Sequence, residues 1–259
     1  MVQPFTTHLV PDIFYPDSDG QLMADNTKQF RWIVVIKENL ELLFADRSDV
    51  FVAGDLLWYP VEGSNTIRQA PDVMVVLGRP QSDRGSYKQW EEDNIAPQVV
   101  FEILSPGNRL GTMARKLKFY KRYGIEEYYI YDPDDVDLMG WLRSEDDLDV
   151  IEDMAGWVSP RLGIRFELTP ETLEIYRPDG DRFLTYIELA QLRDQERQAK
   201  EQERQAKEQE RQAKEQALAL AEERLSQLQE ASSQLEAEQH RNERLAARLR
   251  EMGINPEQV

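Results

Sequence analysis

The chain has 259 residues, with 31 lysines and arginines against 49 aspartates and glutamates, two histidines and no cysteine. Without cysteine there is no disulfide, no thiol nucleophile and no cysteine-ligated zinc or iron–sulfur centre, and the two histidines, His8 and His240, stand at opposite ends of the chain. The formal net charge of −18 argues against a nucleic-acid partner, because phosphate contacts need lysine and arginine.

The first two-thirds of the chain alternates helical and strand patterns. Residues 112–123 place apolar side chains at helical spacing, and the runs at 72–77 and 98–104 are apolar enough for buried strands. The order of elements predicts an α/β fold in which a central sheet is flanked by helices. In chain order we expect a helix over 26–44, strands over 50–59, 72–77 and 98–104, a helix over 112–123, a strand over 127–131, and further strands that include 163–167 and 173–176.

The composition changes near Leu189, which predicts two domains, residues 1–189 and residues 190–259. From Ala190 onward there is no aromatic residue, and the heptad QERQAKE occurs three times between residues 195 and 215. Each copy places glutamate four residues before lysine, a spacing that stabilises a helix by about 0.2–0.5 kcal/mol per pair. The second region is therefore predicted to be one long charged helix.

The distal part of this helix carries a heptad seam. Five leucines alternate there with small and polar residues in an a/d register, which favours a coiled coil and a homodimer through residues 190–259. The alternative is an isolated, solvated helix, because three of the ten seam positions are polar. The seam positions are Leu218, Ala221, Leu225, Leu228, Ser232, Leu235, Gln239, Asn242, Ala246 and Leu249.

No segment of the chain has the pattern of a membrane or export signal. The N-terminus lacks a basic stretch followed by an apolar one, and the longest apolar runs are far too short to cross a bilayer. We therefore expect a soluble, cytoplasmic protein without a membrane partner.

Two carboxylates stand out by their context. Asp72, in APDVMVVLG, opens an apolar strand, and Glu102, in QVVFEILSPGN, interrupts a run that is apolar on both sides. A carboxylate in a buried strand is costly unless a cation or hydrogen bonds compensate its charge. On neighbouring strands the two could hold Mg²⁺, which binds one or two carboxylates together with water and phosphate oxygens. The ion could activate a water molecule and neutralise charge on a phosphodiester.

A cation and other acidic residues could complete this group. Lys116 lies on the following helix, with Tyr120 four residues later on the same face. Structural interpretations remain open: Asp72 could cap a turn, Glu102 could pair with a buried arginine, and Asp55 could join the site or anchor a turn.

A cluster of basic residues follows the strand of Glu102. These six residues predict a rim that faces DNA, and the alternative is an ordinary solvated helix face. The acidic balance of residues 1–189, with 19 basic and 34 acidic residues, opposes tight DNA binding. The cluster consists of Arg109, Arg115, Lys116, Lys118, Lys121 and Arg122.

The segments APDVMVVLG, QVVFEILSPGN and RKLKFYKRYGIEEYYIYDPD, in this order, resemble the Uma-type family of "putative restriction endonucleases" in the PD-(D/E)XK nuclease superfamily. The resemblance covers about residues 25–190. It implies a restriction-endonuclease-like mixed central sheet flanked by helices, and a metal-dependent endonuclease that acts on DNA with Mg²⁺, or Mn²⁺ in its place.

The resemblance also implies roles for particular residues. Asp72 matches the aspartate of the PD motif and Glu102 the acidic residue of the (D/E)XK motif, and both would be metal ligands. The superfamily lysine should stand at position 104, which is Leu104 here, and Lys116 of the next helix matches it instead. The nearest competitor for that role is Lys118, and Thr112 stands where many relatives carry an acidic residue.

Other residues match the family pattern less closely. Asp55 matches an aspartate of the preceding strand, and either Glu38 or Glu41 could contribute from the first helix.

Two functions follow from these observations. The first is a Mg²⁺-dependent endonuclease that hydrolyses DNA phosphodiester bonds, with Asp72, Glu102 and Lys116 as its catalytic residues. The second is a catalytically degenerate nuclease fold that serves as a binding or assembly module and dimerises through its C-terminal helix. Metal uptake and DNA cleavage distinguish the two.

Overall fold

The computed structural model describes residues 13–18, 20, 24–107 and 110–253, so His8 and Arg109 lie outside the described residues. The contacts divide the chain into two compact units, Met1–Leu189 and Ala190–Val259. Within the described part of the chain, no helix combines the length and the apolar character needed to cross a membrane.

The first unit is built on a mixed six-stranded sheet in the order β1-β3-β5-β6-β7-β8. The neighbours β5 and β6 run parallel, with helix α2 (Leu110–Tyr123) between them in the chain, and every other neighbouring pair is antiparallel. The predicted mixed sheet with flanking helices is thereby confirmed. The strands are β1 (Val50–Gly54), β3 (Val73–Leu77), β5 (Val99–Ile103), β6 (Glu127–Asp132), β7 (Asp137–Ser144) and β8 (Asp147–Val150).

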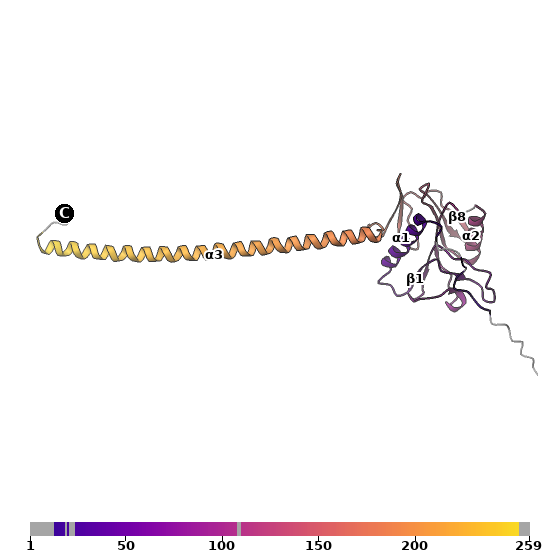
Figure 1. Ribbon diagram of the computed structural model, residues 1–259, viewed down its shortest axis with the longest axis horizontal. Coiled ribbons are helices and arrows are strands. Elements are labelled where there is room, and N and C mark those ends of the chain that lie inside the picture. Colours follow the sequence, from indigo (N-terminus) through magenta and orange to yellow (C-terminus); the bar gives the residue numbers. More distant parts are fainter. Residues whose placement is uncertain (1–12, 19, 21–23, 108–109, 254–259) are drawn as a thin grey trace, which may run out of the picture. The chain divides into compact units, whose positions relative to one another are not determined.

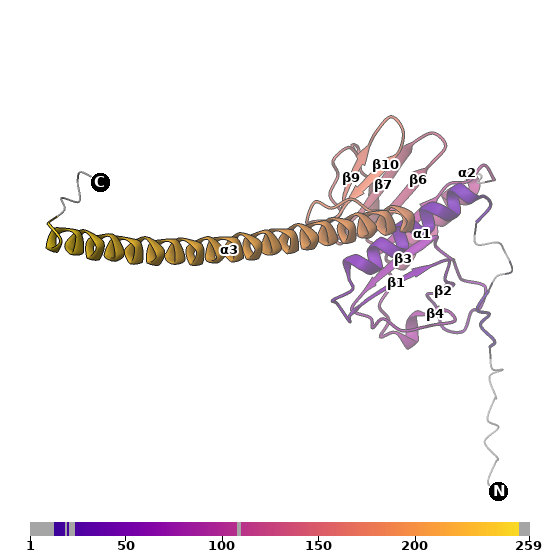
Figure 2. The same cartoon turned by 60° about the vertical axis from the view of Figure 1, so that its left-hand side comes forward.

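Helix α1 (Thr27–Leu43) covers one face of this sheet. Its buried residues Ile33, Ile36 and Leu40 pack with side chains of β1, β3 and β5 in one apolar cluster. Figure 2 shows α1 lying across β1 and β3. The helix begins after Asn26, whose side-chain oxygen accepts a hydrogen bond from the Gln29 backbone N–H at 2.8 Å.

The hairpin of β9 (Arg165–Leu168) and β10 (Leu173–Tyr176) adds to the same apolar cluster through Phe166 and Ile175. The predicted strand over 173–176 matches β10, and the strand predicted over 163–167 begins two residues later than expected. The described part of the first unit also contains β7 and β8, for which no range was predicted.

Helix α2 covers the opposite face of the sheet. Tyr120 is fully buried in a second apolar cluster with Met74, Val100 and Tyr128, while Leu117 packs against its edge. The strands run between α1 and α2 in Figure 1. Strand residues alternate between the two clusters, because successive side chains of a strand point to opposite faces. A polar residue two positions away from Met74 or Val100 along the chain therefore points to the same face, toward α2.

The single strand predicted over 50–59 is wrong. The chain turns at Asp55, whose φ of 49° lies in the left-handed region, and a separate strand β2 (Trp58–Tyr59) then pairs in parallel with β4 (Tyr87–Lys88). The apolar run concealed this turn, because Leu56 and Leu57 continue the apolar pattern of β1 through it.

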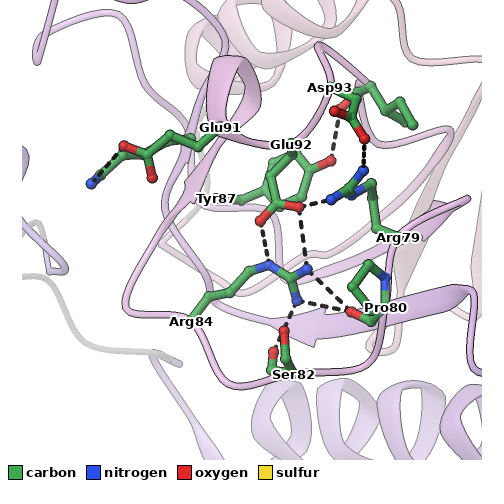
Figure 3. A network of polar contacts seen from close by, with 10 residues as sticks. Arg79, Pro80, Ser82, Arg84, Tyr87, Glu91, Glu92 and Asp93 are labelled. Carbon is green, nitrogen blue, oxygen red and sulfur yellow. Dashed lines mark hydrogen bonds and ion pairs between the residues drawn. The ribbon is translucent and has the colours of Figure 1, made fainter.

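The long connection between β3 and β5 is held by ion pairs. Arg84 binds the Glu92 carboxylate at 2.6 Å and donates to the carbonyl oxygens of Pro80 at 3.1 Å and Ser82 at 2.9 Å. Arg79 binds the same carboxylate at 2.8 Å, as Figure 3 shows. The side chains of Arg84 and Glu92 are mostly buried, so this network orders the segment that joins β3 to β5.

Helix α3 (Tyr186–Glu251) begins in the last residues of the first unit, and from Ala190 onward it makes up most of the second unit. It begins with a capping box in which Thr185 N–H donates to the Glu188 carboxylate at 2.8 Å and Glu188 N–H donates to the Thr185 hydroxyl at 3.2 Å. Within the repeats, Lys207 pairs with Glu203 at 2.6 Å. The predicted long charged helix is confirmed, while its association with a second chain stays a prediction.

Candidate active site

The register of β3 and β5 brings the two predicted carboxylates together. Val73 lies opposite Phe101 in this antiparallel pair, so the next step places Asp72 opposite Glu102. Residues directly opposite in such a pair have Cβ atoms about 4.5–5.5 Å apart. Both side chains share the face of Met74 and therefore point toward α2.

Helix α2 supplies two partners for Glu102, whose side chain is almost completely buried. Lys116 Nζ lies 2.6 Å from Glu102 Oε2, and the Tyr120 hydroxyl donates a short hydrogen bond to Glu102 Oε1. The two partners are four residues apart and so stand on one face of the helix. The charge partner of Glu102 is thus a lysine rather than the buried arginine that the sequence left open.

Asp72 is 8% exposed and has a weaker set of partners. Its Oδ2 accepts a hydrogen bond of 2.6 Å from the Ile103 backbone N–H. Burial and the neighbouring charge of Glu102 raise the pKa of Asp72 to about 8, although Lys116 and the Ile103 N–H act in the opposite direction.

Lys116 keeps its proton in this environment. Burial alone would lower the pKa of its ammonium group, but the charges of Glu102 and Asp72 and the hydrogen bond to Glu102 outweigh burial and raise that pKa. The group is thus a fixed positive charge, suited to stabilising an anion and unsuited to acting as a base.

Asp55 anchors a turn beside the site, one of the two roles that its sequence context left open. Its backbone N–H donates to the carbonyl oxygens of Pro71 at 3.1 Å and Asp72 at 3.2 Å, which anchors the turn after β1 beside the start of β3. Its charge also raises the pKa values of both Asp72 and Lys116, so it lies close enough to act on the site.

The donor set at this site fits a divalent cation. Asp55, Asp72 and Glu102 are three acidic groups, and Lys116 is the one cation that ion-pairs with Glu102 among the described residues. Burial, and after it the charge of Glu102, raises the pKa of Asp72. No group of three or more acidic or histidine side chains in the described ranges has a metal-binding arrangement, but Mg²⁺ needs one or two carboxylates and completes its shell with water.

A buried hydroxyl near the carboxylates lacks a partner. The Tyr128 hydroxyl forms no hydrogen bond with any described residue, and its ring lies 4.9 Å from that of Tyr120. Burial and the charges of Glu102 and Asp72 raise the pKa of Tyr128. An orphaned donor beside two carboxylates is a further feature that a bound water or ligand could satisfy.

The remaining candidates from the sequence lie elsewhere or have other partners. Lys118 is exposed two residues beyond Lys116, so it points away from Glu102, and Leu104 packs against the apolar cluster under α2. Thr112 accepts a hydrogen bond of 3.0 Å from Arg115. Glu38 and Glu41 both pair with Lys37 on α1, across the sheet from Lys116.

The described basic residues of α2 other than Lys116 are exposed. Lys121 pairs with Asp147 at 2.5 Å, and the guanidinium of Arg122 lies over the Tyr123 ring, 5.4 Å from its centroid. Arg115 and Lys118 complete the exposed set on this helix.

Three contributions to the site were missed by reasoning from the sequence. Tyr120 was noted only for its spacing from Lys116, a signal that could have identified it as a second partner of Glu102. The Ile103 backbone N–H and the Tyr128 hydroxyl carry no sequence signal, because their positions depend on how the strands pair.

Comparisons with known proteins place this site in a family context. Residues 11–221 match the model of the Uma2 family, described as "Putative restriction endonuclease". A solved structure from Anabaena variabilis, described as "a putative nuclease belonging to DUF820", is similar over 52% of this chain and 72% of its own, with 14% identity and a TM-score of 0.40. A search of curated proteins found no significant match.

Proposed function

The chain belongs to the Uma2 family of "putative restriction endonucleases", and from this premise we propose that it is a Mg²⁺-dependent endonuclease that hydrolyses phosphodiester bonds in DNA. One observation carries the proposal. Asp72, directly before β3, lies opposite Glu102 of β5, and a buried lysine of α2 contacts Glu102 at 2.6 Å. Two neighbouring carboxylates beside a protonated amine are the groups that the proposed reaction needs.

Each residue has a distinct part in this proposal. Asp72 and Glu102 would hold Mg²⁺, which when bound supplies an activated water and neutralises phosphate charge. Lys116 keeps its proton and so stabilises the negative charge that develops on the phosphate in the transition state. Tyr120 is a positioning residue, because its hydrogen bond holds the Glu102 carboxylate. Mn²⁺ would serve in place of Mg²⁺.

The exposed basic residues of α2 support contact with DNA. Arg115, Lys118 and Arg122 are exposed on the helix that also carries Lys116. Binding of lysine and arginine to phosphates releases condensed counterions, and this release becomes less favourable as salt is added, so the affinity falls. The acidic balance of residues 1–189 predicts weak binding that is easily screened, and the assay therefore belongs at low salt.

The direct test is nicking of supercoiled plasmid by the full chain with Mg²⁺ or Mn²⁺ at low salt. The parent protein is expected to cut, while Asp72→Ala and Glu102→Ala are expected to be inactive. Lys116→Ala should abolish cleavage even when DNA is saturating, whereas Lys118→Ala should only weaken DNA binding, since Lys118 is exposed and lies away from Glu102. Cleavage that survives both carboxylate substitutions would overturn the assignment of the site.

A second candidate function is a catalytically degenerate binding or assembly module. It is favoured by one observation: both carboxylate oxygens of Glu102 already have protein partners. Lys116 binds one oxygen and the Tyr120 hydroxyl the other, so the charge of Glu102 is compensated without a metal. Calorimetric titration with Mg²⁺ and Mn²⁺ separates the two candidates. Metal uptake that disappears in Asp72→Ala supports the nuclease, whereas no uptake and no cleavage of several DNA forms support the module.

A further inference from the structure

The distal half of α3 exposes a row of leucines. Leu218, Leu225, Leu228 and Leu235 are each more than half exposed, and the heptad register places all four on one face of the helix. An apolar stripe of this kind on a helix that is otherwise charged is typical of a surface that a second helix covers.

The proximal half of α3 cannot continue this seam. Extended backward through the repeats, the same register places Arg197, Arg204 and Arg211 at one seam position and Lys200, Lys207 and Lys214 at the other. Their charges are compensated within the helix, as in Lys214 with Glu210 at 2.5 Å. Residues 190–217 therefore form a solvated spacer of about 40 Å at 1.5 Å per residue, and the seam is confined to residues 218–249.

The polar seam residues decide between a parallel and an antiparallel pair. In a parallel, in-register pair, Ser232, Gln239 and Asn242 each face the same residue of the partner helix, where their side chains can hydrogen-bond each other. In the antiparallel pair that aligns the same seams, each of these three faces a leucine, which leaves a polar group in an apolar layer without a partner.

The flanking charges do not favour either orientation. The parallel pair brings Glu238 close to Glu243 of the second helix, and the antiparallel pair brings Glu222 close to Glu243. Each orientation has one repulsive contact of this kind, so the polar seam residues carry the decision.

We propose that residues 218–249 form a parallel, in-register, two-stranded coiled coil with a second copy of this chain. Both N-terminal units are then attached to the same end of the dimer, each through its own charged spacer. If the first unit is the nuclease proposed above, two sites become available to two strands of one DNA molecule. The coiled coil itself does not depend on that function.

The absence of cysteine from the chain makes a direct test possible. The variant Ser232→Cys places a thiol at a seam position, opposite its own copy in a parallel, in-register dimer. Mild oxidation by oxidised glutathione should then produce a covalent dimer of the full chain on a non-reducing gel. Ser233→Cys is the matched control, because its side chain lies next along the helix but outside the seam. We expect cross-linking at least ten times faster at position 232.

Three results would overturn the proposal. The first is equal cross-linking rates for the two variants, and the second is a monomeric mass by light scattering at the same protein concentration. The third concerns orientation: a mixture of tagged Ser232→Cys and untagged Leu235→Cys should form mainly homodimers if the pair is parallel. A predominance of the mixed dimer would establish the antiparallel arrangement instead, since that arrangement places Ser232 opposite Leu235.

Discussion

Two buried carboxylates on the same sheet have very different surroundings. Glu102 on β5 faces α2, beside Asp72 and in contact with Lys116. Glu127 on β6 is fully buried and lies on the opposite face of the sheet, the face that it shares with Tyr129 two residues later. It accepts hydrogen bonds from the Tyr129 hydroxyl at 2.8 Å, the Ser159 hydroxyl at 2.5 Å and the Arg161 backbone N–H at 2.6 Å.

Burial alone therefore does not separate the carboxylate that we propose as a metal ligand from one that belongs to a structural network. Glu127 is held by neutral donors that join β6 to the segment before β9, and no second carboxylate raises its pKa. Glu102 instead shares its surroundings with Asp72 and with the unpartnered hydroxyl of Tyr128. Unmatched charge and an unmade hydrogen bond distinguish a site that can accept a ligand from a satisfied structural network.

The largest expected effect is on catalysis. Glu102→Gln should reduce plasmid nicking about a thousand-fold, because a neutral amide is a poor metal ligand and metal-ion stabilisation of the transition state is worth several kcal/mol. Glu127→Gln should leave the rate per folded molecule unchanged. The rates are compared after circular dichroism has established the folded fraction of each variant. Equal losses in the two variants would remove the distinction drawn between the two carboxylates.

The second effect is on stability, where the substitution of Glu127 should cost more than that of Glu102. Glu127→Ala should lower the free energy of unfolding by about 3 kcal/mol, because it leaves three buried donors without an acceptor. Glu102→Ala should cost less, since Asp72 can then keep its charge beside Lys116. Urea unfolding of both variants measures the difference, and a greater loss in Glu102→Ala would contradict it.

The third effect concerns pH. Burial raises the pKa of Glu127 above its value of about 4.3 in an unfolded chain, so the folded state binds the additional proton between the two pKa values. The contribution of Glu127 to the free energy of unfolding is thus highest below that window. It falls as the pH rises through the window, by at most about 1.4 kcal/mol per pH unit. Glu127→Gln should remove this contribution. Urea titrations of parent and variant across the window check it, and parallel curves would refute it.

The smallest effects distinguish two tyrosines of the second apolar cluster. Tyr120→Phe should cost about 1 kcal/mol, because Glu102 loses a hydrogen bond. Tyr128→Phe should be close to neutral, since its hydroxyl has no partner among the described residues. Thermal unfolding of the two variants, which differ from the parent by one oxygen atom each, measures the contrast. A cost for Tyr128→Phe as large as that for Tyr120→Phe would indicate a partner for its hydroxyl.

Reasoning from the sequence located the two carboxylates but overlooked Glu127. Asp72 and Glu102 are flanked by apolar residues, so the local sequence pattern predicted that both are buried. Glu127 follows Glu126 and opens a strand of tyrosines, where a charged residue is unremarkable in sequence. Its burial arises because the segment around Ser159 and Arg161 folds back over it from more than thirty residues away.

Local periodicity and short motifs were enough to predict the sheet with flanking helices, the long charged helix, the family resemblance and the pair of acidic residues. The contacts of Lys116 and Tyr120 with Glu102, the position of Asp72 opposite it and the turn at Asp55 became known from the folded chain. Such contacts depend on strand register and on how a helix packs against a sheet. Register and packing are set by many weak interactions between distant residues, so no single segment of the sequence encodes them.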